Sequence, residues 1–536
     1  MQLNESGLKD REEWMKKGYR LPEFDRETVR KKTEETPQWI HFGAGNIVRA
    51  FQANVVQELL NRGIMDTGLI VAEGYDCEII KKINDAHDSF SILVTLKSDG
   101  TVEKTVIGSV VESLEVNPQK EKDLKRLKEI FCADSLQIAS FTITEKGYSL
   151  KGADGQYLPD VEKDLRNGPE TPKSYIGKIA SLLYERYRSG EKRIAMVSMD
   201  NCSHNGDRLR EAMETFALAW KKNSRTDAGF LSYLQDREKV SFPWSMIDKI
   251  TPRPDKKAEE ILKADGIEGM EPIVTEKNTY IAPFVNAEEC QYLVIEDEFP
   301  NGRPQLEAGG IFLTSREIVD RAEKMKVCTC LNPLHTALAV FGCLLGYQLI
   351  SEEMKNPVLK KLIERIGYEE GLPVVSDPEI LDPRKFIEEV IQIRFPNPFM
   401  PDTPKRIATD TSQKLAVRYG ETIKAYEKAY RCAAEELEMI PLVIAGWIRY
   451  LMAVDDQGNP FTLSPDPLLS QLQPIVKEIS FGFSGDIQEK IRPILENKTI
   501  FGTDLYEVGL ASKIVFYLKE MIAGKGAVEA TLKKYV

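Results

Sequence analysis

Several residue types and patterns are scarce in this chain of 536 residues. Its four histidines form no His-x-x-x-His or His-Glu-x-x-His spacing, which argues against a histidine-rich catalytic zinc site. Its eight cysteines include no Cys-x-x-Cys pair, so neither a structural zinc nor a disulfide framework is expected. No run of about 18 uncharged apolar residues is present, and no signal or transit pattern opens the chain. We therefore expect a metal-free protein of the cytoplasm.

The chain also lacks a positive net charge, because its 84 acidic residues outnumber its 72 basic residues. The formal net charge is −12, and no block of basic residues of the kind that binds nucleic acid or an anionic membrane occurs. The sequence thus predicts no nucleic-acid partner and no membrane partner, and an anionic substrate would need a few locally placed cations. At this length two large domains are expected, as a monomer or a small homo-oligomer.

A glycine-containing turn lies near the start of the chain. Residues 39–42 are expected to form a short strand and residues 47–60 an amphipathic helix, with Gly43-Ala44-Gly45 between them. In that context the glycines let backbone N–H groups approach a pyrophosphate at a helix N-terminus, although Val48 stands where the third glycine of the usual motif would be. We assign five residues to cofactor binding: Gly43, Ala44, Gly45, Asn46 and Ile47.

The next apolar run, residues 69–72, ends in Glu73. An acidic residue at the end of the second strand accepts hydrogen bonds from the adenosine ribose hydroxyls and repels a 2′-phosphate, so NAD is predicted over NADP. Asp76 is a competing candidate, and a structural surface acid is the alternative to both. The cofactor expected here is therefore NAD, with Glu73 as its ribose ligand.

Strand and helix patterns then alternate through the first half of the chain. Apolar strands are expected at 90–95, 106–110, 137–142 and 194–198, between helices at 121–131 and 173–188, which predicts a doubly wound α/β sheet. Thr144 and Glu145 follow one strand end, and Asp200-Asn201 follow another, where ligands of open α/β sheets bind. We assign Thr144 and Glu145 to cofactor binding as well. The boundary is expected near 285, giving a dinucleotide-binding domain at 1–285 and a helical domain at 286–536.

A polar cluster precedes an apolar helix in the second half, in KVCTCLNPLHTALAVFGCLLGY. Lys326 is expected to end one helix, and Asn332, followed by proline, to begin the next, because VCTCL is poor helix material. This break would let Lys326, Asn332 and His335 converge beside a helix N-terminus, where they could stabilise an alkoxide. The same residues also fit an N-cap, a surface lysine and an ordinary helix-start histidine.

Seven stretches together resemble the mannitol dehydrogenase family, the long-chain polyol dehydrogenases. They occur in the family's order between about 38 and 420: GAGNIVRAFQA, TEKGY, DNCSHNGDRLR, FPWSMIDKITP, VIEDEFPNGRP, LNPLHTALA and RFPNPFMPDTPKRIATDTSQKLAVR. The resemblance implies a Rossmann-type N-terminal domain, an all-helical C-terminal domain, and metal-independent hydride transfer with a lysine as acid/base. In the family such enzymes act on small sugar or sugar-acid substrates.

The resemblance also implies individual roles. Lys326 matches the family's acid/base lysine and Glu323 its proton-relay acid, whereas Asn201, Asn332 and His335 match ligands of the substrate oxygen. One departure leaves Lys324 as an alternative to Lys326: the family commonly has four residues between the lysine and the asparagine, and this chain has five. Asp248 matches a substrate-side aspartate and is assigned with the cofactor-binding set. The predicted substrate-binding cations are Arg406, Lys414 and Arg394.

The expected reaction is the interconversion of D-fructuronate and D-mannonate with NAD. The cations at Arg394, Arg406 and Lys414 favour a carboxylate-bearing substrate, since arginine binds carboxylates through two parallel hydrogen bonds. A tagaturonate reductase and a mannitol-type polyol 2-dehydrogenase remain alternatives within the family. A non-catalytic dinucleotide-binding protein is the alternative from another class, and retention of lysine, asparagine and histidine together argues against it.

Overall fold

The computed structural model describes residues 1–429 and 433–536, which divide into two compact units. The first comprises 1–97 and 101–320, and the second comprises 98–100 and 321–536. The boundary expected at 285/286 differs from this division, because it falls inside β13 (Phe284–Glu288). That strand is buried along its whole length and pairs with β4 (Ser91–Leu96) of the first unit, so the chain leaves this unit some 35 residues later than predicted.

The first unit is built on a six-stranded sheet in the order β6-β3-β2-β7-β8-β9, and all its pairings are parallel. The chain runs outward from β2 to one edge, returns to the centre and continues to the other edge, which is the doubly wound order. The strands are β2 (Trp39–Phe42), β3 (Leu69–Glu73), β6 (Val110–Glu115), β7 (Ile138–Phe141), β8 (Ile194–Ser198) and β9 (Val240–Ser241).

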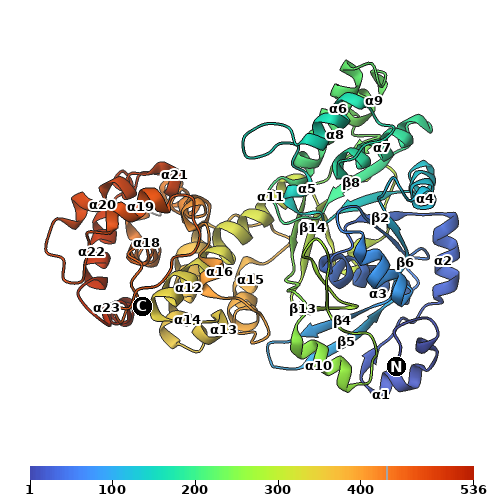
Figure 1. Ribbon diagram of the computed structural model, residues 1–536. Helices are drawn as coiled ribbons and strands as arrows, with labels where there is room; N and C mark the ends of the chain where they lie inside the picture. The colour runs from blue at the N-terminus through green and yellow to red at the C-terminus, as the bar shows by residue number, and fades with distance from the viewer. Residues whose placement is uncertain (430–432) are drawn as a thin grey trace. The chain divides into compact units, whose positions relative to one another are not determined.

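Helices connect and flank these strands (Figure 1). A π-helical turn, Val48–Gln52, leads into α3 directly after the glycine-containing loop. The helices of this unit are α1 (Arg11–Lys16), α2 (Arg26–Glu35), α3 (Ala53–Asn61), α4 (Glu121–Cys132), α5 (Thr144–Gly147), α6 (Pro159–Asn167), α7 (Tyr175–Arg188), α8 (Asn205–Lys222), α9 (Gly229–Gln235) and α10 (Lys256–Ala264).

Both faces of the main sheet are buried in apolar cores. Successive side chains of each strand point to opposite faces, so each central strand contributes to both cores. Trp39, with Leu69 and Val71, packs in one core together with α3, whereas Ile40 and Phe42 pack in a second core with α4, α7 and α8. Continuous apolar runs are therefore required in the central strands, and this is why the sequence pattern predicted them. The doubly wound, Rossmann-type fold is confirmed.

Two smaller sheets and a two-stranded ribbon complete the first unit. The strand expected at 90–95 exists as β4, but it lies in a separate sheet of order β1-β5-β4-β13, and its placement in the doubly wound sheet was wrong. A third sheet has the order β10-β14-β15. The remaining strands are β1 (Tyr19–Arg20), β5 (Val102–Ile107), β10 (Ser245–Asp248), β11 (Ile273–Val274), β12 (Tyr280–Ile281), β14 (Tyr292–Glu296) and β15 (Phe312–Thr314).

All named elements among the described residues of the second unit are helical, as predicted, and Figure 1 draws them from yellow to red. The helix α11 (Arg316–Lys324) begins in the first unit and continues into the second. The others are α12 (Asn332–Leu345), α13 (Ile350–Glu353), α14 (Pro357–Glu364), α15 (Pro383–Glu389), α16 (Pro404–Ile407), α17 (Glu421–Lys428), α18 (Met439–Tyr450), α19 (Leu469–Val476), α20 (Ile487–Leu495), α21 (Lys498–Phe501), α22 (Ala511–Met521) and α23 (Ala527–Tyr535).

The segment expected to separate two helices is itself helical. Met325–Cys330 forms a π-helix between α11 and α12, with the Leu331 N–H donating to the Lys326 carbonyl at 3.1 Å. A turn closed by an i→i+5 bond accommodates one more residue than an α-helical turn. The expected non-helical connector is therefore corrected to a π-helical turn. Arg316–Leu345 is long and apolar enough to cross a membrane, but 78% of its most apolar window is buried inside the protein.

Candidate active site

The loop after β2 is shaped by its glycines. Gly43 has φ +109°, and a Cβ there would collide with the carbonyl oxygen of Thr142 at the end of β7, so a side chain is excluded. At Gly45, by contrast, a Cβ would meet no atom within 4 Å. Helical structure starts at Asn46, so backbone N–H groups of a helix N-terminus point at this space. The loop fits a pyrophosphate of a dinucleotide.

Glu73, the expected ribose ligand, is 8% exposed and already accepts four backbone hydrogen bonds. Its Oε2 accepts from the Ala44 N–H at 2.8 Å, and its Oε1 accepts from Gly74, Tyr75 and Asp76 at 2.7–3.2 Å. Oε2 keeps acceptor capacity for a hydroxyl, since each carboxylate oxygen offers about two lone-pair sites. Glu73 therefore also joins the glycine-containing loop to the loop after β3.

The competing acid, Asp76, is engaged elsewhere: its Oδ2 accepts the hydroxyl hydrogen of Thr275 at 2.6 Å. Arg49, which was not selected from the sequence, fixes the glycine-containing loop through its guanidinium. Its guanidinium donates to the carbonyl of Ala282 at 2.7 Å and to Oδ1 of Asn46 at 2.9 Å, and burial lowers its pKa to about 10. Asn46 is thus held by Arg49, and Ile47 is half-buried.

The ends of β7 and β8 are joined by Asp200. Its carboxylate accepts from the N–H groups of Ile143 and Thr144, both at 2.9 Å, and from the hydroxyl of Tyr148 at 2.6 Å. Burial raises the pKa of Asp200, and these hydrogen bonds oppose the rise. Thr144 is exposed with φ +64°, so this carboxylate holds it in a conformation that β-branched residues rarely adopt.

The neighbouring predicted residues of the first unit lie around this edge of its sheet. Asn201 is exposed directly after Asp200, and Glu145 forms an ion pair with Arg208 at 2.6 Å. Asp248 is buried at the end of β10, where it pairs in register with Tyr292 of β14. The glycine-containing loop, Glu73, Thr144 and Asn201 therefore all follow the carboxyl ends of parallel strands, as expected for a cofactor site.

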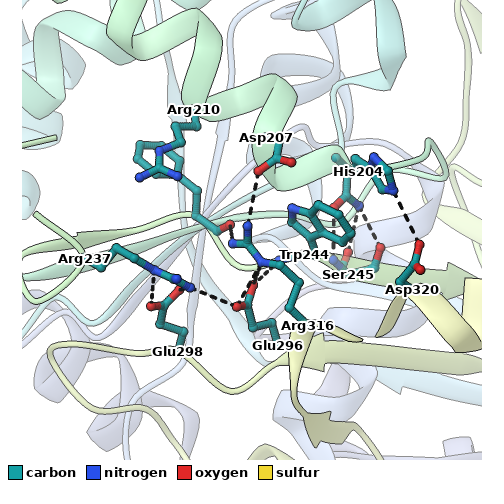
Figure 2. A network of polar contacts seen from close by, with 12 residues as sticks. His204, Asp207, Arg210, Arg237, Trp244, Ser245, Glu296, Glu298, Arg316 and Asp320 are labelled. Carbon is teal, nitrogen blue, oxygen red and sulfur yellow. Dashed lines mark hydrogen bonds and ion pairs between the residues drawn. The ribbon is translucent and has the colours of Figure 1, made fainter. Parts of the chain in front are cut away.

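Charged side chains anchor the beginning of α11 in the first unit (Figure 2). The Nε of Arg316 donates to both carboxylate oxygens of Glu296, at 2.9 and 3.1 Å, and an N–H of its guanidinium reaches Asp207 in α8 at 3.4 Å. The carboxylate of Glu296, 8% exposed, also pairs with Arg237. One buried carboxylate thus ties the end of β14 to the first turn of α11.

A second contact of the same network involves His204, which follows Asn201 in the loop before α8. Its Nε2 lies 3.4 Å from Oδ1 of Asp320 in α11, and its ring stacks on Trp244 with centroids 4.1 Å apart. The guanidinium of Arg316 also lies 4.9 Å from the centroid of the Trp244 ring. Figure 2 shows these groups side by side. The first turns of α11 are therefore fastened to the loop before α8 within the first unit.

In the second unit, burial distinguishes the two candidate lysines. Lys326 is 2% exposed, within the π-helical turn, whereas Lys324 is exposed at the end of α11. Glu323 lies three residues before Lys326 and is half-buried. A lysine enclosed by protein fits an acid/base role better than one in water, because desolvation makes the ammonium a readier proton donor.

Asn332 and His335 both lie in the first turn of α12, where unpaired backbone N–H groups give the helix N-terminus a positive electrostatic potential. His335 packs against Phe395, with ring centroids 5.0 Å apart, and its Nε2 lies 3.6 Å from Oδ2 of Asp402. The Nε2 atom is buried without a hydrogen-bond partner among the described residues. Burial lowers the pKa of His335 to about 4, although the charge of Asp402 opposes this, so the imidazole is neutral.

The three predicted substrate cations differ in their surroundings. The exposed guanidinium of Arg406 pairs with Asp402, which lies four residues earlier. Arg394 is buried, and Lys414 donates to the Thr409 carbonyl, with its pKa lowered by burial and by the charge of Arg418. Asp402 and Arg418 were not selected from the sequence, although both lie within the last stretch that carries the family resemblance.

The match to known proteins extends over both units. The Rossmann domain of the mannitol dehydrogenases matches residues 37–308, and their C-terminal domain matches residues 319–522. D-Mannonate oxidoreductase of Thermotoga maritima is 52% identical over 538 aligned residues, covering 100% of this chain and 99% of that protein. The chain belongs to the mannitol dehydrogenase family.

More distant relatives agree with this assignment. D-Mannonate oxidoreductase of Escherichia coli is 29% identical over 474 residues, covering 87% of this chain and 89% of that protein. A crystal structure of D-sorbitol dehydrogenase superposes with a TM-score of 0.79 at 25% identity, covering 96% and 97% of the two chains. Mannitol 2-dehydrogenase of Pseudomonas fluorescens, in a ternary complex with NAD and D-mannitol, has a TM-score of 0.69 at 26% identity, covering 100% and 99%.

Proposed function

We propose that this chain is an NAD-dependent oxidoreductase that interconverts D-fructuronate and D-mannonate. The observation that carries the proposal is the 52% identity, over the whole chain, to D-mannonate oxidoreductase of Thermotoga maritima. Bound NAD supplies the hydride acceptor, and in its reduced form the hydride donor, of this chemistry. The remaining steps belong to side chains of the protein.

The first unit is proposed to hold the cofactor. The open space at Gly45 and the helix beginning at Asn46 suit a pyrophosphate, while the free acceptor capacity of Glu73 Oε2 suits a ribose hydroxyl. The carboxylate of Glu73 would repel a 2′-phosphate, which supports NAD over NADP. Thr144, Glu145 and Asp248 stay assigned to the same set.

The second unit is proposed to move the proton. As the keto carbon is reduced, its oxygen gains negative charge, and buried Lys326 gives it a proton while Asn332 donates a hydrogen bond from the helix start. Glu323, three residues before the lysine on the same helix, is the proposed relay acid. His335, being neutral, orients a substrate hydroxyl, and Asn201 remains assigned to the substrate oxygen by family resemblance.

The substrate is thus a small sugar acid, and the proposal includes a cytoplasmic location without nucleic-acid or membrane partners. A net charge of −12 and the lack of a basic block support the absence of such polyanionic partners. Monomer and small homo-oligomer both remain compatible with the proposed function.

The test is turnover by purified enzyme with D-fructuronate, D-tagaturonate and D-fructose, each with NADH and with NADPH. We expect D-fructuronate with NADH to give the highest kcat/KM. A wild-type preference for fructose, or for NADPH, would overturn the corresponding part of the proposal. Glu73→Ala should narrow the preference for NADH, because it removes both a ribose acceptor and the repulsion of a 2′-phosphate.

A further inference from the structure

Arg418 is a largely buried arginine whose charge is compensated by no acidic side chain of the described residues. It lies in a π-helical turn, Ala416–Gly420, that precedes α17. Its only hydrogen bond among the described residues goes to the neutral hydroxyl oxygen of Thr336, and none of those residues forms an ion pair with it. Burial lowers its pKa to about 10, which still leaves the guanidinium charged at neutral pH.

Other buried arginines of this protein use their donors more fully. Arg449, in the same unit, donates to three backbone carbonyls, and Arg186, in the first unit, donates to five. A guanidinium has five N–H donors, and a buried charge without partners is costly. Part of Arg418 is still accessible to solvent, so its unused donors can be reached by a ligand.

Contacts with α12 fix the position of Arg418. Thr336, which accepts its hydrogen bond, follows His335 directly and donates its own hydroxyl hydrogen to the Asn332 carbonyl at 2.9 Å. The adjacent Tyr419 donates to the Pro333 carbonyl at 2.7 Å. The guanidinium is therefore held against the helical turn that carries Asn332 and His335.

The charges around this turn favour an anion. Arg418, Arg406 and Arg394 all lower the pKa of His335, and Arg418 and Arg406 lower that of Lys414, so positive charge gathers around these two side chains. Asp402 is the acid that acts on His335, and it is paired with Arg406. Arg406 thus has an acidic partner, whereas no ion pair with a described residue neutralises Arg418, whose charge is available to a ligand.

We propose that Arg418, assisted by Lys414, binds the carboxylate of the hexuronate substrate and makes the enzyme prefer uronates to neutral ketoses. This inference rests on the proposed function. The guanidinium offers two parallel N–H donors that match the two carboxylate oxygens. A hydroxymethyl group, which replaces the carboxylate in fructose, has a single uncharged oxygen and cannot match both donors.

The test compares wild type, Arg418→Met and Arg418→Lys with Arg492→Met as a control for loss of positive charge. Arg492 lies on α20 and pairs with Glu489 and Glu496 at the surface. We expect Arg418→Met to lower kcat/KM for D-fructuronate by about 30- to 100-fold, mainly through KM, and to change that for D-fructose by less than about 3-fold. Arg418→Lys keeps the positive charge but loses the two parallel N–H donors, so it should retain part of the preference for D-fructuronate over D-fructose. Arg492→Met should behave as wild type.

Binding gives a second readout that does not depend on turnover. Calorimetric titration with D-mannonate and D-mannitol should show a loss of mannonate affinity in Arg418→Met and no change for mannitol. Thr336→Val, which removes the acceptor of Arg418 without removing its charge, should narrow the fructuronate preference by several-fold. This variant tests the inference even where Arg418→Met folds poorly.

The possible results separate this inference from the proposed function. Proportional losses on both substrates, or an unchanged preference in Arg418→Met and Thr336→Val, would overturn the carboxylate role of Arg418 while leaving a fructuronate-reducing wild type intact. A wild type that favours fructose would instead overturn the proposed function together with this inference.

Discussion

Tyr148 donates its hydroxyl hydrogen to the carboxylate of Asp200 at 2.6 Å, and this bond joins the loops that follow two neighbouring strands of the main sheet. The same carboxylate accepts the N–H groups of Ile143 and Thr144. Since Thr144 has φ +64°, its conformation depends on such external bonds. Asp200 therefore shapes the loop assigned to the cofactor without itself having to touch the cofactor.

The first prediction concerns this carboxylate. Asp200→Ala should lower the free energy of unfolding by about 2–4 kcal/mol, because two backbone N–H groups and a hydroxyl lose a charged acceptor. It should also raise KM for NADH by about 10-fold or more, since Thr144 and Glu145 lose their fixed geometry. Both quantities are measured, by urea unfolding and by steady-state kinetics.

Asp164→Ala is the matched control for that variant. Asp164 is likewise buried and accepts from the backbone N–H groups of Lys173 and Ser174 and from the Ser174 hydroxyl, but it lies in α6. It should lose similar stability while KM for NADH stays unchanged. Equal KM changes in both variants would show that the effect of Asp200 is one of general stability alone.

Local patterns predicted the central strands well. Residues 39–42 and 194–198 coincide with β2 and β8, because strands buried on both faces must be apolar throughout. The same local signal does not identify the partner of a strand, so β4 was recognised but placed in the wrong sheet. The boundary at 285/286 failed for a related reason: residues 274–304 are rich in turn-forming and acidic residues, as a linker would be, although the β13 and β14 strands within them are paired and largely buried.

The candidate site was only partly readable from the sequence. Glycine spacing after a strand predicted a tight turn, and the asparagine and histidine predicted a helix start. The structure has a tight turn at Gly43 and begins α12 at Asn332. Side-chain pairs that form only in the folded chain leave no such pattern in the sequence. Arg406 was selected because it matches a substrate-binding cation of the family, whereas its pairing with Asp402 depends on a helical turn that only the folded chain shows.

The acid/base assignment is tested by two neighbouring lysines. Lys326→Ala should lower kcat by about 100-fold or more, as expected for loss of a general acid, while NADH binding is retained. Lys324→Ala, which removes an exposed lysine two residues earlier, should leave kcat close to that of wild type. The reverse pattern would transfer the role to Lys324.

The lysine mechanism predicts that metal chelators do not change the rate of turnover. In the proposed mechanism Lys326 supplies the proton, and amide donors with a helix N-terminus stabilise the oxyanion, so no Lewis acid is required. Turnover of D-fructuronate should be the same before and after incubation with EDTA. Strong inhibition that added divalent metal reverses would contradict the metal-independent mechanism.

The stability of the protein should depend on pH through His335. Its pKa is about 4 in the folded protein and near 6.5 when unfolded, so the unfolded chain binds a proton that the folded chain does not between these values. Above about pH 6.5 the imidazole is neutral in both states and costs no stability. As pH falls below this value the folded state loses stability, and the loss reaches about 3 kcal/mol near pH 4. His335→Gln should remove it, so urea unfolding should show wild type losing stability relative to the variant on acidification, and parallel curves would refute this.

The last prediction concerns Arg316, at the start of the helix that continues to Lys326. Its guanidinium is held by Glu296, Asp207 and the face of Trp244 (Figure 2), and Lys326 lies ten positions further along the same continuous helix. Arg316→Met releases the first turn of that helix and leaves Glu296 with Arg237. We expect a fall of about 1–2 kcal/mol in the free energy of unfolding, since the pair is partly exposed.

Activity separates anchoring from stability in the same variant. Misplacing a catalytic group by a fraction of an ångström is costly, so Arg316→Met should lower kcat by about 3- to 10-fold, with KM for NADH little changed. Arg126→Met is the matched control: Arg126 forms a two-point pair with Glu112, of comparable exposure, on α4 of the same unit. It should lose similar stability and keep wild-type kcat. If kcat falls equally in both variants, or in neither, the network does not position the lysine helix, and Arg316 contributes to folding alone.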